Sequence, residues 1–435
     1  MKWHWPALVL GLAAIGTLGT FGITHSENMW PQVSDQQIGA SQWNMFGTGP
    51  SHDAVIESGP NQNLSVQWTR QFSQPLMQPS VVRGVVYVGG IGNKPAVYAI
   101  DAKTGKTLWK TDVNNQVMTT PVVHNGIVFV GSGNHNFPIS HVPQYGVQII
   151  RGSGPSAVYA LDARTGAILW KHETQGEDMP TFVYANHLVY VANGSDELLA
   201  LSPLTGQTVW KLSLPSYVSM SSPTIVGNMM YFGGTHPAAI YAINLQTHQV
   251  QWMHTLPHPL GGSDDVPPAA GDGMIYFDYV QQVHNQPHEV VYALNAENGH
   301  TVWTVDEGPG TIPVGPNGGP RDETGIPTIY GNRLYVSSPL TDSFYAFNLQ
   351  TGALDFRVHF KSQMTQGPVI YQGVCYVGDV HGNFYAINAT TGQIQGKLHF
   401  QGAFMPSTPV LVGQTLFIGD KAGQFMAIPL SEFAS

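Results

Sequence analysis

The stretch "PSVVRGVVYVGGIGNKPAVYAIDAKTGKTLWKTDV", residues 79–113, decides the fold because it is one complete copy of a repeat. It contains four short runs of alternating apolar residues, separated by turns rich in Gly, Asn or Asp. Such alternation is typical of β-strands, and tight turns between short strands join antiparallel neighbours. The stretch therefore predicts a four-stranded antiparallel sheet.

This unit returns seven times, and each further copy starts at a proline. The copies begin at Pro121, Pro180, Pro223, Pro268, Pro327, Pro368 and Pro409. Most third strands read Tyr-Ala-apolar-Asp/Asn, as in Tyr98 to Asp101, and the Asp or Asn can hydrogen-bond the following turn. Sheets repeated in this way are typical of the blades of a β-propeller.

The fourth strand brings a large aromatic ring to the same place in most copies. The rings belong to Trp109, Trp170, Trp210, Trp252 and Trp303, while Phe356 and Gly396 depart from the pattern. One ring at a fixed position in each repeat can fill the gap between neighbouring blades. We therefore expect these tryptophans to be structural.

The two ends of the chain complement each other. The last copy stops at "QFMAIPLSEFAS", one strand short, and the first copy is preceded by an extra strand, "LSVQWTRQF", whose Trp68 occupies the fourth-strand position. Pairing them would leave no free sheet edge. The prediction is an all-β chain forming a single eight-bladed β-propeller, closed by an N-terminal strand that pairs with the C-terminal blade.

Charge and composition limit the partners. Charged residues make up 10% of the 435 residues, against about 25% in an average soluble protein. The net charge of −10 and the lack of a basic run argue against nucleic-acid binding. Low charge suits adaptation to an acidic exterior, because fewer groups repel one another there. A neutral exported protein with an amide-rich surface fits equally well.

The N-terminus predicts export. Lys2 precedes an apolar stretch from Pro6 to Ile23, so residues 1–30 are expected to be a signal peptide or a membrane anchor. Residues 31–63 then lead into the propeller, which occupies 64–435. The one cysteine, Cys375, excludes a disulfide within the chain, and its place in a strand indicates an inert core thiol. We expect an extracytoplasmic location, either periplasmic or at the cell surface.

Insertions are expected on one face, termed the upper face, where linkers between blades and loops between second and third strands meet. They are residues 132–156, 280–289 and 307–325. Loops gathered on one side of a rigid scaffold are typical of a functional site, although they could also cap the channel.

Methionines precede most of the first strands, at the expected mouth of the channel. They are Met77, Met118, Met179, Met220, Met364 and Met405. The copy that begins at Pro268 has Asp264 and Asp265 there instead, and Glu323 precedes the next copy. The methionines could form a polarisable collar or plug the channel. Paired carboxyls at a partly apolar mouth repel each other, so one is expected to have a raised pKa and to transfer protons.

The Tyr-Ala-x-Asp, Thr-Gly and Trp signature resembles the pyrroloquinoline quinone (PQQ)-type propeller repeat family from Trp43 to the C-terminus, and "QWNMFGTGPSHD" at 42–53 resembles its N-terminal motif. The family includes quinoprotein dehydrogenases, outer-membrane assembly lipoproteins and polythionate hydrolases. The dehydrogenases carry an adjacent cysteine pair, which one cysteine cannot supply, and there is no haem motif. The lipid-bearing cysteine of the assembly lipoproteins is also absent. We therefore predict no cofactor, whether PQQ, calcium or another metal.

The chain is most similar in character to the cofactor-free tetrathionate hydrolases of that family. That resemblance implies that an aspartate, here Asp265 with Asp264 and Glu323 as further candidates, activates water. A small anionic substrate would contact Arg321, Arg151 and His258 beside Met118, Met220 and Met405. A noncatalytic propeller scaffold tethered to the membrane stays open as the alternative, a PQQ-dependent dehydrogenase is less favoured, and the sequence leaves the oligomeric state open.

Overall fold

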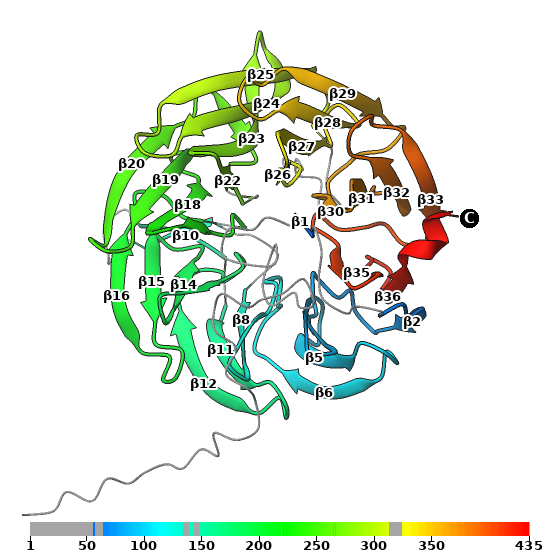
Figure 1. The fold of residues 1–435 in the computed structure, drawn as a ribbon. Coiled ribbons are helices and arrows are strands. Elements are labelled where there is room, and N and C mark those ends of the chain that lie inside the picture. The colour runs from blue at the N-terminus through cyan, green and yellow to red at the C-terminus, as the bar shows by residue number, and fades with distance from the viewer. Residues whose placement is uncertain are drawn as a thin grey trace, which may run out of the picture.

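Eight four-stranded antiparallel sheets surround a central axis in the computed structural model (Figure 1). The structure describes residues 55–56, 64–133, 139–142, 148–152, 154–218, 220–263, 265, 267–312 and 324–434. The shortest strand of each blade lies nearest the axis and the last strand forms the rim (Figure 1). This arrangement confirms the predicted eight-bladed β-propeller.

The first four blades follow the chain order from the axis outwards. Their strands are β3 (Ser80–Val82), β4 (Val85–Gly89), β5 (Ala96–Asp101) and β6 (Thr107–Asp112) in blade one; β7 (Val122–His124), β8 (Ile127–Ser132), β11 (Ser156–Asp162) and β12 (Ile168–Thr174) in blade two; β13 (Val183–Ala185), β14 (Leu188–Ala192), β15 (Glu197–Leu201) and β16 (Thr208–Ser213) in blade three; and β17 (Thr224–Val226), β18 (Met229–Gly234), β19 (Ala239–Asn244) and β20 (Gln249–Thr255) in blade four. A separate hairpin, β9 (Ile139–Val142) with β10 (Gln148–Arg151), is inserted in blade two.

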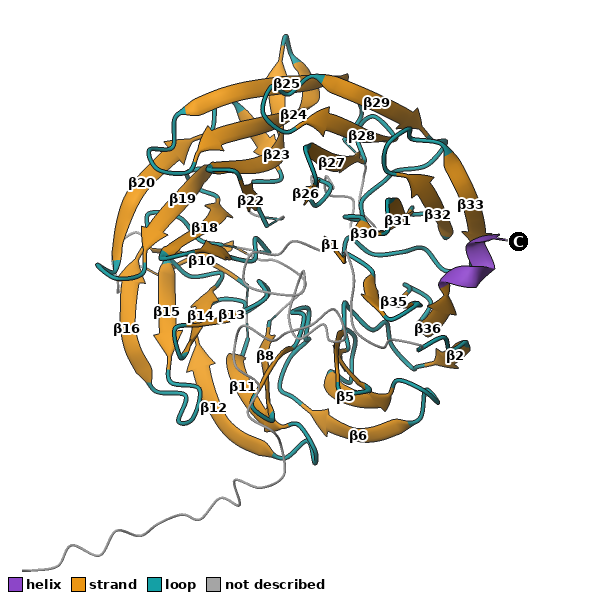
Figure 2. Cartoon of the chain, viewed as in Figure 1, coloured by secondary structure: helices purple, strands orange, loops and turns teal. Residues whose placement is uncertain are grey.

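The other four blades continue the ring, and three of them hold a strand from elsewhere. Their strands are β22 (Ala269–Gly271), β23 (Met274–Val283), β24 (Gln286–Asn295) and β25 (Thr301–Pro309) in blade five, with β21 (Pro259–Gly261) added to β23; β26 (Thr328–Tyr330), β27 (Arg333–Ser338), β28 (Ser343–Asn348) and β29 (Leu354–His359) in blade six; β30 (Val369–Tyr371), β31 (Val374–Gly378), β32 (Asn383–Asn388) and β33 (Ile394–His399) in blade seven, with β1 (Val55–Ile56) parallel to β30; and β34 (Val410–Val412), β35 (Thr415–Gly419), β36 (Gln424–Pro429) and β2 (Trp68–Gln71) in blade eight. The 3-10 helix η2 (Leu430–Ala434) follows and stands beside β33 at the rim (Figure 2).

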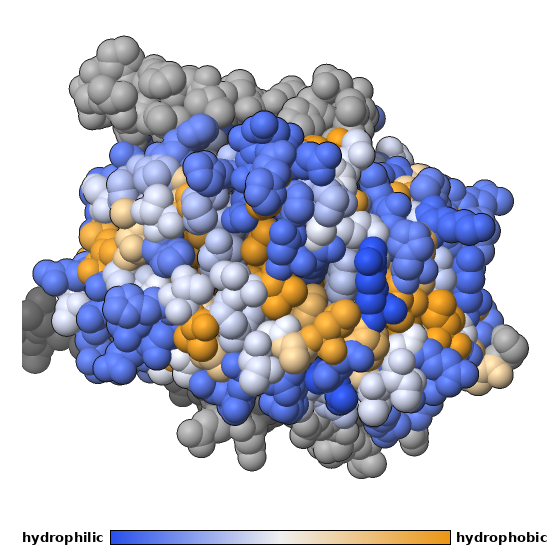
Figure 3. Space-filling model, turned by 90° about the horizontal axis from the view of Figure 1, so that it is seen from above, coloured by the Kyte–Doolittle hydropathy of each residue, from blue (hydrophilic) through white to orange (hydrophobic). Residues whose placement is uncertain are grey.

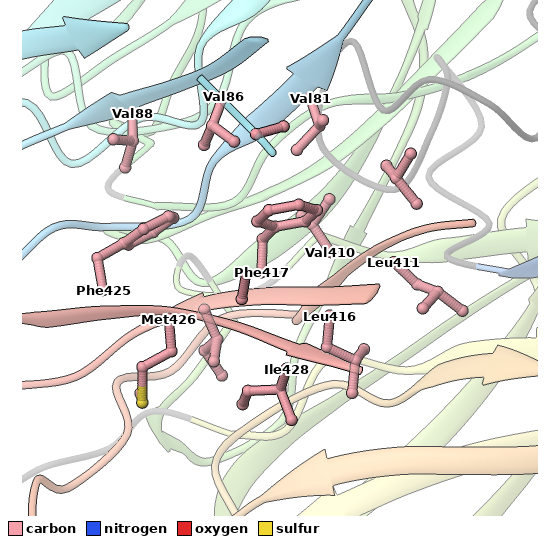
Figure 4. Close-up of a cluster of buried hydrophobic side chains, with 14 of the residues drawn as sticks. Val81, Val86, Val88, Val410, Leu411, Leu416, Phe417, Phe425, Met426 and Ile428 are labelled. Carbon is pink, nitrogen blue, oxygen red and sulfur yellow. The ribbon is translucent and has the colours of Figure 1, made fainter. Parts of the chain in front are cut away.

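The strand β2 closes the ring as the sequence predicts. It pairs antiparallel with β36, and Trp68 lies opposite Ala427. The interface between blades eight and one, termed the closing seam, is apolar: Val81 and Val86 of blade one share a buried cluster with Phe417 of blade eight (Figure 4). The predicted segment 1–30, and 31–63 apart from β1, lie outside the described residues. Within the described chain, no helix is long and apolar enough to cross a membrane.

Most fourth-strand rings pack against the glycine of the turn in the next blade. The indole nitrogen of Trp109 donates to the carbonyl oxygen of Ala163 at 2.9 Å, and a Cβ atom on Gly166 would lie 2.6 Å from the same ring. Gly166 also has a φ of +74°, which favours glycine. The same contact joins Trp68 to Gly105, Trp170 to Gly206, Trp252 to Gly299, Trp303 to Gly352 and Phe356 to Gly392. The rings are structural, as expected.

Two blades depart from this contact between a fourth-strand ring and a turn glycine. His248 takes the place of the turn glycine beside Trp210, with a φ of +55°, and its ring stacks on the indole with centroids 4.3 Å apart. At Gly396 no ring exists, and a Cβ atom there would lie 2.1 Å from the carbonyl oxygen of Phe433. Phe433 comes from η2 and packs edge-on against Tyr376. The C-terminal helix therefore fills the space that a fourth-strand ring fills in the other blades.

Candidate functional site

The upper face is built from two kinds of connection, as the sequence predicts. In several blades, the linker that enters the blade pairs with the loop between the second and third strands of the same blade. The bridged pairs are Leu76 and Gly90, Gln116 and Gly133, Tyr217 and Thr235, and Phe404 and Asp420. Seen from the side, polar residues dominate the exterior and apolar residues form scattered patches (Figure 3). The base of the upper face therefore consists of short linkers that are hydrogen-bonded to the loops between second and third strands.

The insertion at 280–289 is not a loop, contrary to expectation. The strands β23 and β24 extend through it to the pair Val283 and Gln286. The two residues between them, His284 and Asn285, have φ of 48° and 63°. A two-residue turn with both φ positive matches the twist of a hairpin, which is why the strands continue to its tip. Blade five therefore has two ten-residue strands.

Asp265 lies in the linker that enters blade five. Its backbone N–H donates to the carbonyl oxygen of Gly262 at 3.2 Å. The side chain is half-buried, and its Oδ1 has no contact with solvent. The linker packs tightly on blade four, because a Cβ atom on Gly233 would lie 1.6 Å from the carbonyl oxygen of Ser263. The backbone around Asp265 is therefore fixed by close packing at the interface between blades four and five.

Arg151 ends the inserted hairpin of blade two and reaches over blade three. Its Nε lies 3.0 Å from Oε1 of Glu177, whose side chain is fully buried. Its guanidinium carbon lies 5.9 Å from the centre of the Tyr217 ring, a cation–π distance. Backbone hydrogen bonds with Gly194 and Glu177 fix the end of the hairpin. The sequence analysis placed Arg151 as an anion contact but did not identify Glu177 as its partner.

A continuous set of contacts joins the region of Arg151 to that of Asp265. Tyr217 lies in the linker entering blade four, and a Cβ atom on Gly234 would lie 3.2 Å from its carbonyl oxygen. The carbonyl oxygen of Gly234 accepts a hydrogen bond from Ser263 Oγ at 3.3 Å. Asp265 follows two residues later. The arginine on the blade-two hairpin and the carboxyl on the linker entering blade five are thus connected through the linker entering blade four.

The predicted methionine collar is only partly accessible. Met118 and Met220 are half-buried, whereas four lie in the core, namely Met77, Met179, Met364 and Met405. Burial of most of the thioethers is what a plugged channel requires. A contact of Met118, Met220 or Met405 with substrate stays a prediction.

The other predicted site residues divide into one exposed residue and three that lie outside the described part of the chain. His258 is exposed, with a φ of 44°, and its carbonyl oxygen accepts from Gln282 N–H at 2.9 Å. Asp264, Arg321 and Glu323 lie outside the described residues. Their roles remain predictions from the sequence.

Sequence reasoning missed a cluster of three carboxyls on blade five, termed the acid cluster. Asp278, Glu289 and Glu307 come from the adjacent strands β23, β24 and β25, and none exposes more than 9% of its surface. Two of them replace residues of another type in the repeat. Where Asp278 stands, the other blades have Gly89, Gly131, Ala192, Gly233, Ser337, Gly378 and Gly419; where Glu307 stands, they have Phe72, Val113, Thr174, Leu214, Leu256, Phe360 and Phe400.

Burial dominates the electrostatics of the acid cluster. It raises the pKa of Asp278 well above its ordinary value, and repulsion from Glu289 and Glu307 raises that pKa further. Burial likewise raises the pKa of Glu289 to about 7 and that of Glu307 well above its usual range. Aligning the repeats position by position would have revealed both substitutions, so the signal was present in the sequence.

A second buried acid lies beside Glu177. Burial raises the pKa of Asp178 to about 7, although hydrogen bonds from Thr174 and Asn193 oppose the rise. Asn193 Nδ2 donates to Asp178 Oδ1 at 3.1 Å, and Thr174 Oγ1 donates to Oδ2. This acid is fully hydrogen-bonded and ties the blade-two strand β12 to the linker entering blade three. We interpret it as structural.

Two features of the dehydrogenase cofactor sites concern the described part of the chain, namely a metal-binding group and an adjacent pair of cysteines. In the part of the chain that the structure describes, no group of three or more His, Cys, Asp or Glu side chains has the geometry to hold a metal ion. Cys375 is the one cysteine of the chain and is buried, so an adjacent cysteine pair cannot form.

Comparisons with known proteins point to two functional classes. The chain is 28% identical to the tetrathionate hydrolase of Acidithiobacillus ferrooxidans over 461 aligned residues, covering 94% of this chain and 89% of that protein. It is 28% identical to the tetrathionate hydrolase of Acidianus ambivalens, covering 84% and 73%. Among solved structures, BamB from Moraxella catarrhalis superposes with a TM-score of 0.61 at 18% identity, covering 84% and 99%, which shows the shared fold.

A family model settles the wider membership. The model described as outer membrane protein assembly factor BamB matches residues 33–143, 144–282 and 287–432, which is most of the chain. These three matches cover all eight blades. The chain therefore belongs to this family of PQQ-like repeat propellers.

Proposed function

We propose that the protein is an exported, cofactor-independent hydrolase of the tetrathionate hydrolase type. The similarity to two tetrathionate hydrolases, one of them along nearly the whole of both chains, carries the proposal. The placement of Arg151 on the blade-two hairpin and of Asp265 on the linker entering blade five, connected through the linker entering blade four, supports it, because hydrolysis of a dianionic polythionate is favoured by both a cation and a base. A likeness at 28% identity supports the class of reaction rather than each residue's role.

In the proposed reaction Asp265 acts as general base. It takes a proton from water, and the water oxygen forms a bond to one sulfur of the chain. The adjacent sulfur–sulfur bond breaks, and its electron pair leaves with the departing sulfur fragment. A half-buried carboxylate whose Oδ1 has no contact with solvent suits this role, since its charge is less screened than at an open surface. Arg151, held by Glu177 and Tyr217, would orient an anionic end of the substrate.

The second candidate is a noncatalytic scaffold outside the cytoplasm. The family model bears the description of an outer-membrane assembly factor, and the BamB structure matches the fold. Under this proposal residues 1–30 tether the propeller to a membrane, and the upper face binds a protein. No reaction would then depend on Asp265.

One assay separates the candidates. The exported domain is incubated with tetrathionate at acidic and neutral pH without added cofactor, and loss of tetrathionate and formation of thiosulfate are followed. Turnover supports the hydrolase and excludes a purely structural role. Absence of turnover at every pH, with a cooperatively folded protein, contradicts the hydrolase. Turnover that requires PQQ and calcium would instead indicate a dehydrogenase-like cofactor site.

A further inference from the structure

The acid cluster lies at the interface between blades five and six, termed the acid seam, rather than on either open face. Ser338 Oγ, on β27 of blade six, donates to Glu289 Oε2 at 2.5 Å. The backbone N–H of Leu340 donates to the same oxygen at 3.4 Å. Thr324 Oγ1, in the linker entering blade six, donates to the carbonyl oxygen of Asp278 at 3.4 Å. Blade six therefore contacts the cluster through both its linker and its second strand.

Five oxygens of the acid cluster are buried without a hydrogen-bond donor among the described residues. They are Asp278 Oδ1 and Oδ2, Glu289 Oε1, and Glu307 Oε1 and Oε2. A buried ionised carboxylate without donors is costly. A protonated carboxyl gains an O–H donor and can bond to a neighbouring carboxylate. Bound protons therefore supply the hydrogen-bond donors that these buried oxygens lack among the described residues.

We propose that Asp278, Glu289 and Glu307 form a proton-operated clamp, which holds blade five against blade six while its protons are bound and loosens that seam when they are lost. This clamp is independent of the proposed hydrolase activity. The clamp would make the folded state most stable at acidic pH.

The surrounding charges do not neutralise the cluster. Arg357 on β29 lowers the pKa of Glu307, but burial and the neighbouring Glu289 raise it more strongly. Asp306, next in the chain, adds a further repulsion and is itself paired with His288 at 2.8 Å. The Tyr345 hydroxyl donates to the backbone carbonyl of Glu307 and not to its carboxyl. Among the described neighbours, one cation therefore faces three acids.

The direction of the pH effect follows from the pKa shifts. An ordinary carboxyl releases its proton near pH 4. In the folded state burial raises the pKa of Glu289 to about 7 and the pKa values of Asp278 and Glu307 well above their ordinary range, which opens a pH window above about 4. The folded state therefore binds more protons than the unfolded state across that window. Stability is unaffected by these groups below about pH 4 and falls as pH rises through the window.

The test compares thermal unfolding and amide hydrogen exchange at pH 5 and pH 8, with exchange rates corrected for intrinsic amide chemistry. In the wild-type protein we expect the melting temperature to fall by at least 5 °C, a shift of the size that linkage effects produce. Exchange should rise in peptides covering 274–289 and 324–340 and stay unchanged in blades one and eight.

Glu289→Gln should abolish at least half of that fall, because its amide oxygen still accepts from Ser338 while its NH2 can donate to Asp278. Glu297→Gln is the matched control, since it removes an exposed carboxyl from the turn between β24 and β25, away from the upper face. This variant should show the full fall in melting temperature. If Glu289→Gln does not fold, Asp278→Asn makes the same test. Each of three results would overturn the proposal. They are a wild-type melting temperature that is the same at both pH values, amide exchange that rises equally in all blades, and variants whose melting temperature falls as far as that of the wild type.

Discussion

The closing seam and the acid seam join neighbouring blades of the same repeat with opposite chemistry. At the closing seam, Val86 and Phe417 are fully buried in a shared apolar cluster (Figure 4). At the acid seam, Asp278 and Glu289 are equally buried but carry ionisable groups. Apolar burial does not depend on pH, whereas burial of a carboxyl does. Within one fold, the closing seam can therefore be stable at any pH while the stability of the acid seam changes with pH.

The largest effect is expected from removing the strand that completes the closing seam. Deletion of residues 64–73 removes β2 and exposes the whole edge of β36. An open edge of this length pairs with other chains, so the product should aggregate. Size-exclusion chromatography measures the outcome. Trp68→Phe, which keeps the strand, should stay monomeric; a monomeric deletion variant with an unchanged melting temperature would refute closure by β2.

Phe417→Ala should cost about 3–5 kcal/mol in the free energy of unfolding, because it leaves a cavity in the closing seam. The side chain is fully buried and its ring lies 6.1 Å from that of Trp68. No titratable group takes part, so denaturant unfolding should give the same cost at pH 5 and pH 8. A cost that changes strongly with pH would show that the two seams are not separate in their chemistry.

Ser338→Ala gives the smaller and complementary effect at the acid seam. It removes the donor to Glu289 and the acceptor of the Thr341 N–H, so about 1–3 kcal/mol should be lost. A hydrogen bond to a charged group is the stronger one, so the cost should be larger at pH 8, where Glu289 is ionised. Denaturant unfolding at both pH values measures it. An equal cost at both would indicate that Glu289 does not change its charge in this range.

The fold could be predicted almost completely because local rules repeat. Alternation, turn glycines and an aromatic ring in most copies determine strands, turns and blade count, and Trp68 marks the closing strand. What escaped was the pairing of rings with turns: the contact of Trp109 with Gly166 joins residues of different blades. The role of Phe433 at Gly396 was equally hidden, since it depends on how the C-terminus returns to blade seven.

The site was less predictable because its contacts cross between loops. The sequence identified Arg151 and Asp265 by type and expected position, but not that Glu177 pairs with the arginine. The acid cluster was overlooked for a different reason. Asp278 and Glu307 stand in extended strands that look ordinary until each is compared with the same position in the other copies.

The most direct test of the proposed function is the turnover of tetrathionate by Asp265→Asn. The substitution keeps the shape of the linker and removes the proposed base, so kcat should fall by about 10²–10⁴ with KM little changed. Asp272→Asn is the matched control: Asp272 is exposed, lies on the opposite face of the same blade and has a φ of 50°, which asparagine also adopts. Full activity in the control with this loss in Asp265→Asn is the predicted result. Full activity in both variants would contradict the assignment of Asp265 as the base.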